Sequence, residues 1–171
     1  MLLDQRQIAQ RIPHAGSMCL LHAVTAWDEN AIEARAISHR DTQNPLRCAQ
    51  GLGISAGIEY AAQAIAVHGN LAGGQGAARS GRLASTRSIR CHIRWLHLID
   101  GELAVKARRI MGDDAMLVYE FELSSPGQIL LTGRASIALM NAENAIHYHT
   151  RFCPSPHRHR AHRTSHLRSR R

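Results

Sequence analysis

The sequence predicts an α+β domain in which an antiparallel sheet of about six strands wraps around one long central helix. Five segments alternate apolar and polar residues, which is the period of a half-buried strand, and a sixth segment, residues 19–27, also has the residues of a strand. One segment is apolar on nearly every side, as expected of a buried helix. Such a helix is about 25 Å long, and the sheet covers only one side of it. We therefore expect the other side to meet a second subunit.

The first third of the chain is expected to contain a short helical turn, two strands joined by a tight turn, and a loop. These elements cover residues 5–11, 19–27, 31–38 and 39–54. Pro13 follows the helical turn and marks its end. Asp28-Glu29-Asn30 supplies the turn between the strands, so the two strands are predicted to form a hairpin.

Residues 55–71 form the predicted long helix. Ser55 is the expected N-cap, and Gly69 is the expected C-terminal stop. Alanine and larger apolar residues occupy most positions, and Glu59 is the only acid. The helix is therefore expected to be buried.

Four more strands are predicted after the helix. They cover residues 86–96, 102–111, 115–123 and 128–140. The connections at 112–114 and 125–127 have the residues of tight turns, so these strands are expected to be antiparallel. Cys19 and Cys91 lie in strand-like apolar runs and are expected to be buried.

The positive charge of the chain is concentrated at its end. The net charge is +8, from 21 Lys+Arg and 13 Asp+Glu. Residues 142–171 hold seven Arg and one acid, which leaves 21 − 7 = 14 basic and 13 − 1 = 12 acidic residues in 1–141. We expect a folded domain at 1–141 and a disordered basic tail at 142–171. Nucleic acid is expected to bind at most nonspecifically, through this tail.

Several classes of protein are not supported by the sequence. No apolar run approaches the length of a membrane-spanning helix, and the N-terminus, with Asp4, lacks the apolar core of a secretion signal. The four cysteines are widely spaced, without the pairs of a zinc site, so reduced thiols in the cytoplasm are expected. No phosphate-binding, zinc-protease or dinucleotide motif is found, and we expect neither metal nor cofactor.

Glu59 is the strongest functional candidate on residue chemistry alone. A carboxylate at the start of an apolar helix is paired, protonated or functional. The helix dipole favours its ionised form and burial opposes it, a balance that suits acid–base work. Free amides near Gly57 and Ile58 are candidates for holding a thioester oxygen, and Gly57 lets a substrate approach the backbone. The alternative is a structural glutamate that pairs with an arginine or caps its own helix.

Three segments resemble the hotdog-fold 3-hydroxyacyl-acyl-carrier-protein dehydratases. Residues 12–21, IPHAGSMCLL, are similar to the Leu-Pro-His-x-x-Pro-Phe-Leu-Leu opening of these enzymes. Residues 57–64, GIEYAAQA, are similar to their Glu-x-x-x-Gln-Ala helix start. Together with SHRDTQNPLR at 38–47, the helix start resembles a divergent branch associated with aryl-polyene biosynthesis. The resemblance covers roughly residues 5–140.

The resemblance implies a dimeric hotdog fold and the elimination of water from a 3-hydroxyacyl group on acyl-carrier protein. In that reaction a histidine takes the α-proton, and a helix carboxylate protonates the departing hydroxyl. The carboxylate corresponds to Glu59, and the amide that holds the thioester oxygen corresponds to Gly57 or its neighbour. The partner is expected to be acyl-carrier protein, and the second hotdog subunit is either identical or different.

The identity of the histidine base stays open at this point. The family's His-Phe-Pro-Gly loop is missing, because Pro45 stands in that place. His39, in the branch's own motif, ranks first, and His14, in the opening motif, ranks second. Asn44 is expected near the substrate, where it would orient the imidazole ring.

Two other functions remain compatible with the same fold. In a thioesterase, Glu59 would activate water instead of donating a proton. In an inactive partner subunit, the domain would support a second hotdog chain. Two interpretations are open for the arginines before and within the predicted strand 86–96. They provide positive charge for the docking of an acidic carrier protein, or they form a solvated sheet face. They are Arg79, Arg82, Arg87, Arg90 and Arg94.

Overall fold

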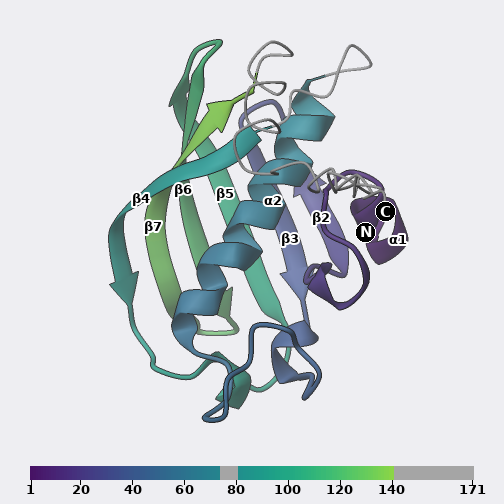
Figure 1. Cartoon of the computed structure of the whole chain (residues 1–171), viewed down its shortest axis with the longest axis vertical. Helices are drawn as coiled ribbons and strands as arrows, with labels where there is room; N and C mark the ends of the chain where they lie inside the picture. The colour runs from purple at the N-terminus through teal and green to yellow at the C-terminus, as the bar shows by residue number, and fades with distance from the viewer. Residues whose placement is uncertain (74–80, 141–171) are drawn as a thin grey trace, which may run out of the picture. The chain divides into compact units, whose positions relative to one another are not determined.

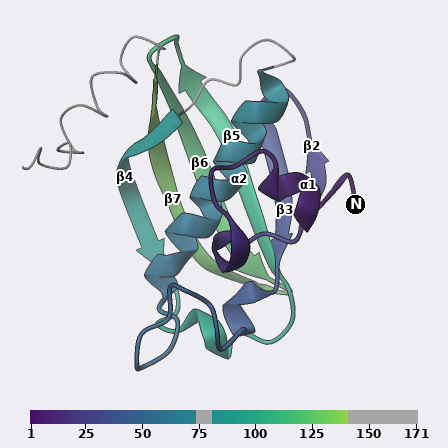
Figure 2. The same ribbon diagram turned by 45° about the vertical axis from the view of Figure 1, so that its right-hand side comes forward.

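The computed structural model describes residues 1–73 and 81–140. In this part of the chain, a seven-stranded antiparallel sheet in the order β1-β2-β3-β5-β6-β7-β4 curves around the long helix α2 (Gly57–Ala72), as Figure 1 shows. The turned view in Figure 2 shows α2 crossing one face of the sheet. The predicted α+β architecture is confirmed, with one short strand added at the sheet edge.

The strands match most of the predicted segments closely. They are β1 (Leu3–Asp4), β2 (Ala23–Trp27), β3 (Ala31–Ala36), β4 (Gly81–Cys91), β5 (Leu103–Gly112), β6 (Met116–Ser125) and β7 (Gln128–Leu139). A short helix, α1 (Gln5–Ala9), lies where a helical turn was expected, and Asp4 caps it in a capping box. The two long hairpins β5–β6 and β6–β7 join the predicted strands in antiparallel register.

The core lies between the sheet and α2. Along β3 the residues Ile32, Ala34 and Ala36 are buried, whereas Glu33 and Arg35 between them are less so. This is the alternation expected when one face of a strand packs against the core. The same pattern explains why the strand segments could be recognised in the sequence.

The strand predicted to begin at Cys19 starts only at Ala23, which corrects that boundary. Before it, Leu20 is buried but lies outside the sheet. Its N–H donates to the side chain of Gln63 at 2.9 Å, and not to a neighbouring strand. A buried apolar segment held by a side chain looks like a strand in the sequence. A single sequence does not reveal that the partner of the main chain is a side chain and not a neighbouring strand.

The strand β4 begins and ends earlier than predicted. It covers Gly81–Cys91 and forms one edge of the sheet, in place of the predicted 86–96. Its pairing with β7 slips at two points, and Ser88 adopts a φ of 53° at the second slip. Cys91 lies at the end of this edge strand and is exposed, contrary to the prediction, whereas Cys19 is buried as expected.

The start of α2 also differs from the prediction. Ser55 lies in a 3₁₀ turn (Ile54–Ala56), and the N-cap residue is Ala56, which has no capping side chain. The 3₁₀ turn continues directly into α2, so the carbonyl groups of Ile54 and Ser55 accept from the Gly57 N–H, in the place of a capping side chain that would accept from the first N–H groups of the helix. The helix also runs past Gly69 to Ala72.

No helix in residues 1–73 and 81–140 is long and apolar enough to cross a membrane. The predicted tail at 142–171 lies outside the described residues, and so does most of the glycine-rich segment after α2.

Two buried histidines link the stability of the domain to pH. Burial lowers the pKa of both His39 and His68 below the usual histidine range. His68 Nε2 lies 3.0 Å from the carbonyl oxygen of Asp28, and Nδ1 lies 2.8 Å from the hydroxyl of Tyr119. Because the carbonyl only accepts, Nε2 carries the proton and Nδ1 accepts from Tyr119. His68 is therefore held in its neutral form.

The free energy of unfolding is expected to fall as pH drops below about 6.5, the usual histidine pKa. Below that value the unfolded chain binds protons that the buried rings bind less readily, so protonation favours unfolding. Urea unfolding at about pH 7.5 and about pH 5.5 measures the effect, and the His68→Gln variant, which cannot titrate at this position, should lose less stability over the interval. An equal loss in wild type and variant would exclude His68 as a cause.

Candidate active site

The predicted acid Glu59 and the second-ranked histidine His14 form a direct pair. Glu59 lies in the first turn of α2, and His14 precedes the 3₁₀ helix Gly16–Met18. His14 Nε2 is 3.0 Å from Glu59 Oε1, and the two side chains are 28% and 31% exposed. Glu59 is thus less buried than its apolar helix implied. The pair is close enough to exchange a proton and open enough to meet a substrate.

One helical turn further on, Gln63 contacts the same carboxylate. Its side chain is fully buried, and Nε2 donates to Glu59 Oε1 at 3.1 Å. Sequence reasoning did not select Gln63 as a site residue. The available signals were the Glu-x-x-x-Gln motif of the helix start, which contains it, and its spacing, because residues four apart lie on the same face of a helix.

His39, the first-ranked base, lies elsewhere. Its ring is fully buried, and Nε2 is 3.0 Å from the carbonyl oxygen of Ile99. Nδ1 is also buried and has no hydrogen-bond partner among the described residues. The structure therefore brings Glu59 together with His14 and holds the ring of His39 against another loop.

Asn44 belongs to a buried network that fastens the 38–47 loop to α2. Ser38 Oγ donates its one hydrogen to the carbonyl of Leu20 at 2.7 Å, so Tyr60 must donate to Ser38 Oγ at 2.8 Å. Asn44 Nδ2 donates to the hydroxyl oxygen of Tyr60 at 3.0 Å and to the Ser38 carbonyl at 2.9 Å. Asn44 Oδ1 accepts from the Leu46 N–H at 3.0 Å. The Asn44 amide is therefore occupied within the protein.

The Tyr60→Phe substitution tests this network. It is expected to lower the free energy of unfolding by about 1–3 kcal/mol, because Asn44 and Ser38 each lose a buried partner. Chemical denaturation measures the change. An unchanged midpoint would show that the hydroxyl of Tyr60 does not hold the loop.

Gly57 has a packing role at the start of α2. A Cβ added to it would lie 2.7 Å from Leu131 Cδ2 and 2.9 Å from Leu123 Cδ2, so only glycine lets the helix approach β6 and β7 this closely. Its N–H already donates to the carbonyls of Ile54 and Ser55. The Gly57 amide is therefore not free for a substrate oxygen. Its neighbour Ile58 is half-buried against the core.

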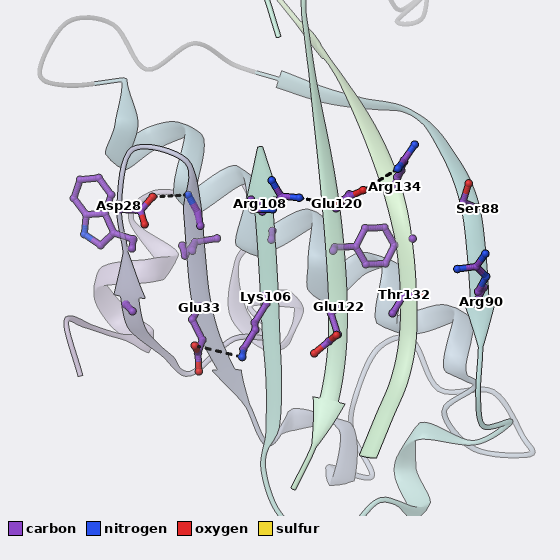
Figure 3. Close-up of a pocket in the computed structure, with 17 residues that line it drawn as sticks. Asp28, Glu33, Ser88, Arg90, Lys106, Arg108, Glu120, Glu122, Thr132 and Arg134 are labelled. Carbon is purple, nitrogen blue, oxygen red and sulfur yellow. Dashed lines mark hydrogen bonds and ion pairs between the residues drawn. The ribbon is translucent and has the colours of Figure 1, made fainter. Parts of the chain in front are cut away.

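A large groove lies on the sheet face turned away from α2, as Figure 3 shows. It has a volume of about 800 Å³, but neither Glu59 nor His14 lines it. Five of its charged side chains pair across strands, with 3.9 Å between Lys106 Nζ and Glu33 Oε2 and 2.8 Å from each of Arg108 and Arg134 to Glu120. Because these pairs neutralise one another, the groove resembles a solvated sheet face.

In the described residues, no three His, Cys, Asp or Glu side chains are arranged to hold a metal ion.

The comparison with protein families decides the class of the domain. The model of the ApeP-like dehydratases, described as ApeP dehydratase, matches residues 6–148. The chain belongs to the ApeP-like dehydratase family. The resemblance seen in the sequence is confirmed at the level of this family.

Solved structures share the fold of this ApeP-like domain. A chain of the dehydratase heterocomplex ApeI:P from Xenorhabdus doucetiae is 24% identical with a TM-score of 0.73, and the match covers 88% of this chain and 100% of that one. A mutant of the thioesterase PA1618 from Pseudomonas aeruginosa is 16% identical with a TM-score of 0.61, covering 82% of this chain and 96% of that one. The thioesterase HI1161 from Haemophilus influenzae is 14% identical with a TM-score of 0.59, covering 82% and 93%. The predicted hotdog fold is thereby confirmed. A comparison with curated proteins gives no match.

Proposed function

We propose that this chain eliminates water from a 3-hydroxyacyl group carried on acyl-carrier protein and forms the trans-2-enoyl thioester. The observation that supports the proposal is the His14–Glu59 pair at the start of the central helix. Membership of a dehydratase family supports this class of reaction.

The elimination requires two proton transfers, and the pair supplies both. Unprotonated His14 takes the α-proton, and the electrons of that C–H bond form the C=C bond. The electrons of the C–O bond leave with the hydroxyl group, which accepts the proton of Glu59 and departs as water. An imidazolium then lies beside a carboxylate, and the contact of 3.0 Å lets the proton return to Glu59. His14 thus replaces His39 as the proposed base.

Acyl-carrier protein is the proposed bearer of the substrate. Arg87, Arg90 and Arg94 are exposed on β4 and just beyond it. They present positive charge to an acidic carrier, and such charge speeds and orients docking.

We propose that the domain works as a subunit of a hotdog dimer. One side of α2 stays only half-buried in the single chain, at Ile58, Ala62 and Ala66. Residues four apart along a helix form one continuous stripe on its surface, and a second subunit would cover this stripe. The similarity to a chain of a heterocomplex makes an unlike partner worth testing beside a homodimer.

The proposal is tested by mixing the purified chain with 3-hydroxyacyl-carrier protein and measuring the mass of the acyl group. Loss of the mass of one water is expected. Release of the free acid without alkene would identify a thioesterase instead. No reaction at any acyl length, alone or with a second hotdog subunit, would contradict the proposal.

A further inference from the structure

We propose that a bulge in the edge strand β4 builds the docking surface for the acidic carrier protein. The bulge turns Arg87 onto the outer face of the sheet, the face turned away from α2, where Arg90 also lies, beside Arg134 on β7. We call these three residues the arginine face. The inference rests on the proposed function, because the carrier protein bears the substrate of that reaction.

The register of β4 against β7 decides which way its arginines point. In a regular strand, Arg87 and Arg90 are three residues apart and would lie on opposite faces. Between them the register slips by one residue, so that Arg87 lies opposite Arg134 and Arg90 lies opposite Thr132. Arg134 and Thr132 both line the outer groove, as Figure 3 shows. Because residues opposite one another in a ladder share a face, Arg87 and Arg90 both point outward.

The slip is held by a residue in a conformation that it rarely adopts. Ser88 has a φ of 53°, in the left-handed region, where a bulge usually has glycine because glycine lacks a Cβ. The next residue, Ile89, still packs against the core and occupies the space that a Cβ on Gly133 would fill. The bulge therefore keeps the core contact of β4 and changes the direction of the arginine before it.

The arginine face carries positive charge that its neighbours do not neutralise. The strands β4 and β7 contain no Asp or Glu. Arg134 pairs with Glu120 on β6, but Glu120 also pairs with Arg108, and each contact is 2.8 Å long. No ion pair joins Arg87 or Arg90 to another described residue. Like charges directly opposite one another, as in Arg87 and Arg134, destabilise a sheet, so an acidic partner would relieve their repulsion and be oriented by it.

The arginine face also lies close to the start of α2, which carries Glu59. The last residue of β4, Cys91, lies opposite Leu131 in β7. Leu131 in turn packs against Gly57, the first residue of α2. Because β4 forms the edge of the sheet, a carrier protein on the arginine face has only to pass its acyl group around the end of this strand to reach Glu59.

The experiment measures the Kd between the purified chain and a fluorescently labelled acyl-carrier protein, at low and at high salt. Arg87→Gln and Arg90→Gln are each expected to raise the Kd about 1.5- to 5-fold, which is the usual worth of an exposed ion pair. The Kd of wild type should rise with salt, and that of the double variant should rise less. Arg6→Gln is the matched control, since it removes the same charge from α1, beside β1 at the opposite edge of the sheet, and it should leave the Kd unchanged.

Two substitutions of Ser88 test whether the bulge itself matters. Ser88→Gly suits the left-handed conformation and should keep the wild-type Kd. Ser88→Val disfavours that conformation, because a β-branched side chain crowds the backbone at positive φ, and should raise the Kd as Arg87→Gln does. Circular dichroism and thermal midpoints, recorded in parallel, check that each variant is folded.

Three results would overturn the inference. The first is a Kd for Arg87→Gln and Arg90→Gln that matches that of Arg6→Gln. The second is the same Kd in Ser88→Gly and Ser88→Val. The third is a short DNA duplex that binds as tightly as the carrier protein and depends equally on the two arginines, which would indicate a face for any polyanion. Because binding is measured without turnover, carrier binding that depends on the arginine face in a chain without dehydratase activity would support this inference and refute the proposed reaction alone.

Discussion

The Glu59→Gln variant is expected to dehydrate 3-hydroxyacyl-carrier protein about 10²- to 10⁴-fold more slowly than wild type, which is the usual contribution of a general acid. Glutamine has nearly the same shape as glutamate, but its amide cannot give up a proton to the departing hydroxyl. The side chain of Glu59 is partly exposed, so the fold should tolerate the change. The measurement is kcat from the rate of alkene formation, with the thermal midpoint recorded for each variant.

Glu122→Gln is a matched control for that experiment. Glu122 lines the outer groove of the sheet, on the face turned away from α2. Its substitution removes the same negative charge and should leave kcat unchanged. Equal losses in the two variants would mean that overall charge, and not an acid at position 59, governs the rate.

The second large effect concerns stability. Leu131→Ala is expected to lower the free energy of unfolding by about 2–5 kcal/mol, because it empties a fully buried site beneath the start of α2. Urea unfolding followed by circular dichroism measures the loss. A change below about 1 kcal/mol would show that α2 does not pack on β7 as the structure has it.

The contact between Leu131 and Gly57 makes a second substitution informative. Gly57→Ala alone should destabilise the domain, since its Cβ would lie 2.7 Å from Leu131 Cδ2. In the Leu131→Ala background that neighbour is gone, and the added methyl group fills part of the space. The double variant should therefore be more stable than the sum of the single losses predicts. Strictly additive losses would contradict this packing.

The strands from β5 to β7 could be placed from the sequence because each buries one face and is bounded by clear turns. The edge strand β4 could not, since its two register slips break the alternation. Beyond Cys91 the chain leaves the sheet, and the Arg94 carbonyl accepts from the Ile54 N–H at 3.0 Å. The apolar residues at Ile93 and Trp95 therefore continue the alternating pattern of a strand that has already ended.

The site was predictable in part. Glu59 stood out as the lone acid of an apolar helix, and His14 was named, but it ranked below His39. The ranking followed sequence motifs, whereas the pairing depends on how the loop before β2 lies against α2. Gln63 helps to hold that loop, and its contacts at Met18 and Leu20 are more than forty residues away in the chain. Contacts of such sequence separation leave no local pattern.

The central claim is that Glu59 and His14 move protons between the α-carbon and the hydroxyl of a 3-hydroxyacyl thioester. The reverse reaction tests it most directly: trans-2-enoyl-carrier protein is incubated with the protein in water labelled with heavy oxygen. Wild type is predicted to place the label in a hydroxyl group on the β-carbon, with the thioester intact and with little labelling by Glu59→Gln. Label found in a released carboxylic acid, or equal β-labelling by Glu59→Gln, would contradict the account.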